Sequence, residues 1–176
     1  MKNKKIIIVV FCFLMLFASS AYAKPSKAKV KKAYKKYIVN EIKAKDPNVK
    51  QYGGKAYYYD INQDGIQELF YRKNINTCEC NVYTYKKGKV KHAGKLYALS
   101  ISYNKKKKRI CVFGKAAIGG VIYDYKLSGS KLKLMVEYRS YEMWPGHSKC
   151  LKNNKEISGK KFDKETKKYY KWNYLC

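Results

Sequence analysis

The pattern of apolar and polar positions predicts a helix near the start of the chain. Between Ser26 and Lys45, apolar residues recur at spacings of three and four and leave the lysines on the opposite face, as in an amphipathic helix. Ser26 is suited to cap its N-terminus, and Asp46-Pro47-Asn48 should end it. The apolar stripe consists of Val30, Ala33, Tyr34, Tyr37, Ile38, Ile42 and Ala44. The alternative is a solvated basic tail, but so regular a stripe favours docking onto a core.

From about residue 55 the periodicity changes to two, which is typical of strands with one buried face. Turn residues such as Lys87-Gly88 and Ser128-Gly129-Ser130 separate the apolar runs. Short links of this kind predict an antiparallel meander. The expected strands are Ala56–Tyr59, Glu68–Arg72, Asn81–Tyr85, Lys89–Tyr97, Leu99–Tyr103, Ile110–Phe113, Gly120–Leu127 and Lys131–Tyr141.

The end of the chain reads as a loop followed by a helix. Pro145-Gly146 and Asn153-Asn154 favour a loop over residues 145–160. Ser158 or Asp163 would then cap a helix that runs to about Trp172. We therefore expect one α+β domain, residues 24–176, in which an antiparallel β-meander sheet is flanked by an N-terminal and a short C-terminal helix.

The first 23 residues have the three parts of a secretory signal peptide. A basic start with Lys2, Lys4 and Lys5 precedes the apolar run 6–17, and Ala21-Tyr22-Ala23 matches a cleavage site before residue 24. The apolar run is short for a membrane span, so cleavage is favoured over an uncleaved anchor. Cys12 lies within that run, which argues against lipid anchoring. The expected location is extracellular, with association to the cell wall as one form of it.

The chain is strongly basic, with 40 Lys and Arg residues against 12 Asp and Glu. Removal of the three signal lysines lowers the formal charge from +28 to +25, and such a charge attracts polyanions. Codon bias in an AT-rich genome is the alternative explanation, but that bias would also favour Glu. Only Arg72, Arg109 and Arg139 are arginines. Because base-edge reading depends on the arginine fork, we expect an anionic polymer such as teichoic acid, and no sequence-specific nucleic acid, as the partner.

An acidic stretch interrupts this basic sequence, since no Lys or Arg occurs between Ala56 and Tyr71. Within it, oxygen-bearing side chains alternate and a glycine follows, which allows the chain to curl around an ion. The ligand set expected for calcium is Asp60, Asn62, Asp64, Ile66 through its carbonyl, and Glu68. The alternative is an Asp/Asn/Gly-rich turn that binds nothing.

The acidic stretch departs from an EF-hand, because Tyr71 stands where a bidentate glutamate belongs. It resembles the D-x-[DN]-x-D-G-x-x-[DE]-L loops of FG-GAP and related β-propeller repeats, and of dockerins. Over residues 30–172 the chain is similar to a group of uncharacterised small proteins, secreted or lipid-anchored, of Gram-positive bacteria. The likeness lies in "YYDINxDGxxEL", "VYTYKKGKVK" and "YKLSGSKLKL". It implies the calcium loop but no activity.

Five cysteines remain after signal removal: Cys78, Cys80, Cys111, Cys150 and Cys176. Outside the cell they could form two disulfides in a pairing that the sequence leaves open. Cys176 is the natural candidate for a free thiol or for a bridge that makes a dimer. Two alternatives are a zinc site from Cys78, Cys80, His147 and Cys150, and a Cys150–His147 nucleophile.

Taken together, these features predict an exported, non-enzymatic binding module. Calcium would stabilise its first hairpin, and its lysines would adhere to anionic cell-envelope polymer. The alternative is a secreted enzyme acting on wall glycan or nucleic acid, which needs a convergent acid/base pair. Asp124, Glu137 and Glu142 are the only loosely grouped carboxylates in the later strands, and their spacing does not favour catalysis.

Overall fold

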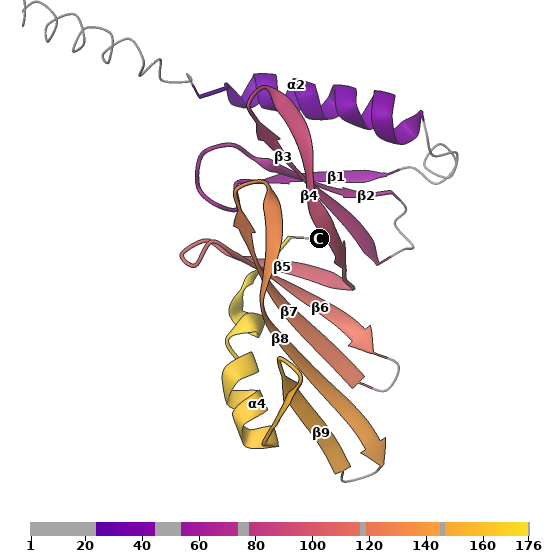
Figure 1. The fold of residues 1–176 in the computed structure, drawn as a ribbon, viewed down its shortest axis with the longest axis vertical. Coiled ribbons are helices and arrows are strands. Elements are labelled where there is room, and N and C mark those ends of the chain that lie inside the picture. Colours follow the sequence, from indigo (N-terminus) through magenta and orange to yellow (C-terminus); the bar gives the residue numbers. More distant parts are fainter. Residues whose placement is uncertain (1–23, 45–53, 74–77, 117–118, 145–146, 176) are drawn as a thin grey trace, which may run out of the picture.

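The computed structural model describes residues 24–44, 54–73, 78–116, 119–144 and 147–175. Within these ranges the chain forms two antiparallel sheets and two short α-helices (Figure 1). The predicted signal peptide and the predicted helix end at Asp46-Pro47-Asn48 lie outside the described residues. None of the helices described here has the length and apolar character needed to cross a membrane.

The first sheet has four strands in sequence order. They are β1 (Lys55–Tyr59), β2 (Glu68–Arg72), β3 (Glu79–Lys86) and β4 (Lys89–Tyr97). Helix α2 (Lys27–Tyr37) continues as the π-helix η1 (Ile38–Lys43). Its buried residues, Tyr34 among them, pack on Leu69 and Tyr71 of β2 and on Tyr83 and Tyr85 of β3.

The second sheet has the order β10-β9-β8-β7-β6-β5-β11. Its strands are β5 (Ser100–Asn104), β6 (Arg109–Ala116), β7 (Gly119–Ser128), β8 (Lys131–Trp144), β9 (His147–Lys152), β10 (Lys155–Ile157) and β11 (Asn173–Tyr174). Helix α4 (Gly159–Thr166) and the 3-10 turn η2 (Tyr169–Lys171) follow β10. Phe162 and Tyr169 from this segment pack with Cys111, Ile122 and Tyr138 of the sheet.

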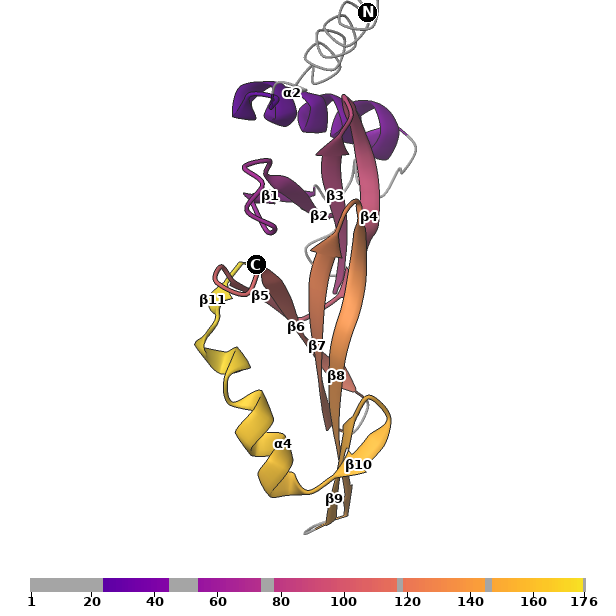
Figure 2. The same cartoon turned by 60° about the vertical axis from the view of Figure 1, so that its left-hand side comes forward.

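One hydrophobic core joins the two sheets, which follow one another along the long axis of the molecule (Figure 2). Phe70, Val82 and Leu96 contribute to it from the first sheet, and Ile101 and Ile110 from the second. In β2 and β3 alternate residues face either this core or α2, as the pleat of a strand requires. Both faces of β2 and β3 are therefore buried.

The predicted antiparallel strands are confirmed, and the eight predicted strands lie within a few residues of the observed ones. Antiparallel sheets with two short α-helices are compatible with the predicted α+β class, whereas the flanking arrangement of the helices stays a prediction. The expectation of one sheet is corrected to two. The chain passes from the first sheet to the second between Ala98 and Leu99. The Ala98 N–H donates to the carbonyl of Cys78, just before β3 of the first sheet, whereas the Leu99 N–H donates to the carbonyl of Phe113 in β6 of the second. Adjacent residues thus bond to different sheets.

The loop predicted over residues 145–160 is wrong, since β9 and β10 form a hairpin there. Asn153 and Asn154 occupy its turn with φ of 49° and 64°, the conformation of a tight hairpin turn. The predicted N-caps Ser26 and Ser158 are confirmed, because their side chains accept hydrogen bonds from the backbone N–H groups of Lys29 and Lys161. However, α4 ends at Thr166 rather than near Trp172.

Candidate functional site

Residues 60–68, called the acidic loop below, connect β1 to β2. The two strands are antiparallel, and Tyr59 opposite Glu68 is the pair next to the loop. The loop is fixed to both sheets. The Tyr103 hydroxyl of β5 donates to the carbonyls of Asp60 and Ile61 at 3.1 and 3.2 Å. Ile61 itself is fully buried in the shared core. The loop is therefore held in place by the second sheet as well as by its own strands.

Helix α2 holds the other side of the loop. The Tyr34 hydroxyl donates to the Gln67 carbonyl at 2.9 Å and, less closely, to the Tyr83 carbonyl at 3.4 Å. Burial is the main cause that raises the pKa of Tyr34 above its ordinary value, so this hydroxyl stays a donor. Neither Tyr34 nor Tyr103 was recognised as part of the site from sequence, because each lies more than 30 residues from its partner.

Within the loop the backbone curls around the side chains expected to bind the ion. The Gly65 N–H donates to Asp60 Oδ2 at 2.8 Å, and Gly65 has φ +77°, a conformation that glycine adopts without strain. The Asp64 N–H donates to Asn62 Oδ1 at 3.1 Å, and the Ile66 N–H donates to Asp64 Oδ1 at 2.8 Å. Side-chain oxygens of Asp60, Asn62 and Asp64 thus accept the backbone hydrogen bonds that close the turn.

Glu68 is the most unusual group of the loop, because its carboxyl is fully buried. Its oxygens accept hydrogen bonds from the Ile61 N–H at 2.9 Å and the Thr84 hydroxyl at 3.3 Å. Burial, reinforced by the negative charges of Asp64 and Asp60, raises its pKa to about 8. The neighbouring Asp60 Oδ1 is buried and accepts no hydrogen bond from the described residues. Neither Asp60 nor Glu68 belongs to a salt bridge among the described residues.

The donor set fits a hard divalent cation such as calcium, since every side-chain atom offered is a carboxylate or amide oxygen. Asp60, Asn62, Asp64 and Glu68 could supply side-chain oxygens, and Ile66 a carbonyl. The Asn62 amide nitrogen at present donates to Asp64 Oδ2 at 2.8 Å, so those two side chains would have to turn towards an ion. Among the described residues no three His, Cys, Asp or Glu side chains form a ready-made metal cluster, and the ligand assignment stays a prediction.

A cavity of about 590 Å³ adjoins the acidic loop. Figure 1 shows the parts that surround it, namely the start of α2, the acidic loop and the tips of the β3–β4 and β7–β8 hairpins. It is lined by Lys24, Pro25, Lys29, Asn62, Asp64, Ile66, Thr84, Tyr85, Lys86, Lys87, Gly88 and Gly129. We call it the lysine pocket. The sequence marked Lys87-Gly88 only as a turn, because nothing local shows that this turn lies beside the loop.

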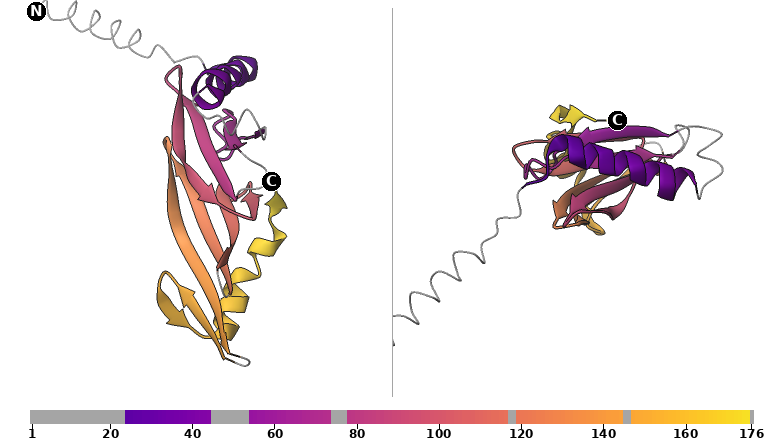
Figure 3. Two further views of the ribbon diagram at one scale, coloured as in Figure 1. Left: turned by 90° about the vertical axis from the view of Figure 1, so that its right-hand side faces the viewer. Right: turned by 90° about the horizontal axis from the view of Figure 1, so that it is seen from above.

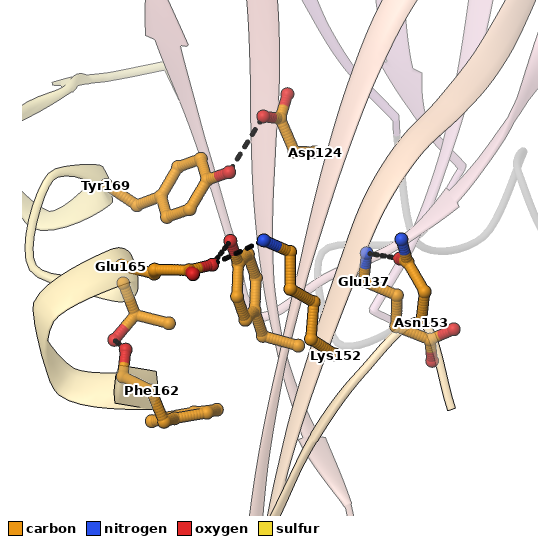
Figure 4. A network of polar contacts seen from close by, with 9 residues as sticks. Asp124, Glu137, Lys152, Asn153, Phe162, Glu165 and Tyr169 are labelled. Atoms are coloured by element: carbon orange, nitrogen blue, oxygen red, sulfur yellow. Dashed lines mark hydrogen bonds and ion pairs between the residues drawn. The ribbon is translucent and has the colours of Figure 1, made fainter. Parts of the chain in front are cut away.

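The carboxylates considered for catalysis have structural partners. Asp124 accepts two hydrogen bonds of 2.7 Å from Arg109 and one of 2.8 Å from the Tyr169 hydroxyl, the last of which is drawn in Figure 4. Glu137 forms an ion pair with Arg139. The side chain of Glu142 lies outside the described residues. Asp124 thus joins β7 to β6 and to η2, whereas the Glu137–Arg139 ion pair lies within β8.

A second set of polar contacts ties α4 to the sheet (Figure 4). Glu165 accepts hydrogen bonds of 2.6 Å from both the Tyr138 hydroxyl and the Lys152 ammonium. Next to Lys152, at the turn between β9 and β10, Asn153 Oδ1 accepts a hydrogen bond of 2.9 Å from the Glu137 N–H of β8. These groups therefore fix the helix and the β9–β10 hairpin against β8.

No disulfide joins Cys78, Cys80, Cys111 and Cys150 to one another among the described residues. Cys80 lies in the shared core and Cys111 beneath η2, where each is surrounded by apolar side chains. Burial raises the pKa values of the Cys111 and Cys150 thiols, which disfavours the Cys150–His147 nucleophile. Cys176 lies outside the described residues, and a bridge through it stays a prediction.

The zinc alternative is not supported either. Cys78 and Cys80 belong to the β3 end of the first sheet, while Cys150 lies on β9 of the second. The described part of the chain contains no cluster of metal-ligating side chains that includes them.

Comparison with family models, curated proteins and solved structures found no match for this chain.

Proposed function

We propose that this protein is an exported, non-enzymatic binding module whose acidic loop binds calcium and whose lysine-rich surface adheres to an anionic cell-envelope polymer. The observation that carries the calcium part is the buried Glu68 carboxyl beside the unpartnered Asp60 Oδ1. A buried charge is costly unless it is paired or bound to a metal ion. A cation in the loop would remove that cost.

Calcium is favoured over other cations by the chemistry of the loop. The side chains offer hard oxygens and no thiolate or imidazole, which a transition metal would prefer. Calcium also tolerates a mixture of carboxylate, amide and carbonyl ligands, whereas magnesium demands near-ideal octahedral geometry. Extracellular calcium modules bind with dissociation constants of about 10⁻⁴–10⁻³ M, and the basic surroundings favour the weak end of that range.

Adhesion to a polyanion is supported by where the lysines lie. Both helices carry exposed lysines: Lys27, Lys29, Lys31, Lys32, Lys35 and Lys36 on α2, and Lys160, Lys161 and Lys164 on α4. The two helices lie towards opposite ends of the long axis (Figure 3). A long polymer could therefore contact basic side chains over much of the length of the molecule.

The test of the calcium part is thermal unfolding of the secreted protein in calcium and in chelator. At a calcium concentration one hundred times the dissociation constant, the free energy of unfolding should rise by about 2.7 kcal/mol. Asp64→Ala should abolish that increase. Asp163→Ala, which removes an exposed carboxylate of α4, is the matched control and should retain it. An unchanged melting temperature at millimolar calcium would show that the acidic loop is a turn that does not bind calcium.

A further inference from the structure

We infer that the lysine pocket binds the phosphate groups of the polymer, and that calcium in the acidic loop strengthens this binding. The inference rests on the proposed function and adds to it a defined site and a reason for calcium dependence. It starts from the position of the pocket, which is lined by four lysines and shares Asn62 and Asp64 with the acidic loop.

The four lysines of the pocket are available to a ligand. Lys24, Lys29, Lys86 and Lys87 are all exposed, and none of them belongs to the salt bridges of the described residues. They come from two elements far apart in sequence, the start of α2 and the β3–β4 turn. Four ammonium groups around one cavity repel one another, so an anion that binds between them relieves this repulsion.

The β3–β4 turn holds its lysines in a defined place. Lys86 pairs with Lys89 across the turn, and Lys87 and Gly88 have φ of +51° and +78°, as in a two-residue hairpin turn. The tip of the β7–β8 hairpin approaches it, since a Cβ on Gly129 would lie 3.7 Å from the Lys86 ammonium. The pocket is therefore built where the two sheets and α2 meet.

The size and lining of the pocket fit one unit of a phosphate-linked polyol or sugar. About 590 Å³ lies within the range of small-molecule sites. Pro25, Ile66 and Tyr85 offer apolar surface for the carbon chain, and lysine is well suited to phosphate as a compact positive charge. A glycerol-phosphate polymer combines both features and is the chemistry to which we commit.

Calcium dependence follows from Asp64, which lines the pocket and is also an expected calcium ligand. Without an ion the Asp64 carboxylate repels an incoming phosphate. With calcium bound, the net local charge attracts the phosphate instead. Lys24 reaches from the pocket to the loop, since its ammonium lies 1.9 Å from where a Cβ on Gly65 would stand. Because coupling between two binding sites is reciprocal, the phosphate polymer should also raise the affinity for calcium.

The experiment measures binding of the secreted protein to immobilised glycerol-phosphate polymer, with calcium or with chelator, by surface plasmon resonance. The pocket variant is Lys29→Gln, Lys86→Gln and Lys87→Gln. Its control, Lys160→Gln, Lys164→Gln and Lys167→Gln, removes the same charge from exposed positions in and after α4. We expect the pocket variant to lose about tenfold in affinity or more, and the control much less. Calcium should strengthen binding of the parent several-fold but not that of the pocket variant.

The outcomes separate the inference from the proposed function. Equal losses in the two variants, or binding of the parent that is the same in calcium and chelator, would overturn the inference while leaving adhesion intact. No binding by the parent under either condition would overturn both. Circular dichroism of each variant shows whether it is folded. A pocket variant that fails to fold is replaced by Lys87→Gln alone against Lys160→Gln, with a smaller difference expected in the same direction.

Discussion

At the scale of single residues, Glu68 combines two properties that conflict unless a cation is present. It is fully buried, and it lies near Asp60 and Asp64. Its hydrogen bonds to the Ile61 N–H and the Thr84 hydroxyl favour the ionised form, but burial outweighs them and the pKa rises to about 8. In the absence of calcium, folding at neutral pH therefore keeps a proton on this carboxyl.

This shift predicts how stability depends on pH in chelator. Because the folded state holds the proton between pH 4.5 and 8 and the unfolded state releases it, the free energy of unfolding should fall as pH rises through that window. Glu68→Gln should remove this contribution, and at pH 8 it should be more stable than the parent, by on the order of 2 kcal/mol. Urea unfolding at several pH values measures both.

Calcium should reverse the order of stability of the parent and Glu68→Gln. In the proposed site the ion would bind the ionised carboxylate, so calcium should stabilise the parent more at pH 8 than at pH 5 and should stabilise Glu68→Gln little at either. Glu156→Gln removes an exposed carboxylate and should keep the pH dependence of the parent. A parent whose stability in chelator rises between pH 5 and pH 8 would contradict this account of Glu68.

At the scale of elements, the C-terminal segment is attached to the second sheet by polar contacts as well as by apolar packing. The Tyr169 hydroxyl is buried and donates to Asp124 Oδ2 at 2.8 Å. The same carboxylate receives two hydrogen bonds from Arg109. Burial, reinforced by the nearby Asp124 carboxylate, raises the pKa of Tyr169, so the hydroxyl remains protonated.

Removal of this one hydroxyl should weaken the attachment measurably. Tyr169→Phe keeps the ring but leaves a buried carboxylate oxygen with one donor fewer, which costs about 1–3 kcal/mol. Tyr170→Phe is a control next to it, because Tyr170 is 70% exposed and should change stability by less than about 0.5 kcal/mol. Thermal or denaturant unfolding compares the two. Equal stabilities would show that the contact with Asp124 contributes nothing to the fold.

At the scale of the whole molecule, the excess of lysine gives a field that is positive over both helices. The acidic loop is the local exception, and it lies beside the lysine pocket. A region that attracts a cation therefore lies next to a region that attracts an anion. The proposed adhesion should therefore have a general part, due to the net charge, and a local part, due to the pocket.

The general part should depend steeply on salt. Lysines that contact phosphates release counterions on binding, so affinity for glycerol-phosphate polymer should fall on the order of tenfold to a hundredfold between 50 and 200 mM salt. The neutral polymer dextran is the comparison and should bind weakly at both concentrations. Affinity for the phosphate polymer that stayed constant across this range would rule out electrostatic adhesion.

Most of the secondary structure could be predicted because it depends on neighbours along the chain. Alternation located the strands from Lys55 to Trp144, and Ser26 and Ser158 cap their helices through residues three positions away. The acidic loop could be predicted for the same reason, since its internal hydrogen bonds join residues two to seven positions apart. The β9–β10 hairpin was missed because Asn153-Asn154 marks a turn without showing whether strands flank it.

The sequence by itself thus determined the antiparallel strands, the helix starts and the grouping of oxygen-bearing residues in one loop. The tertiary structure alone decided that the strands divide between two sheets at Ala98 and Leu99, that Glu68 is buried, and that the β3–β4 turn lies beside the loop. It also placed Cys78 and Cys80 with the first sheet and Cys111 and Cys150 in the second, with no disulfide among the four. The physical reason is range: periodicity and capping act within a few residues, whereas burial and charge proximity depend on contacts such as that of Tyr103 with Asp60, 43 positions apart.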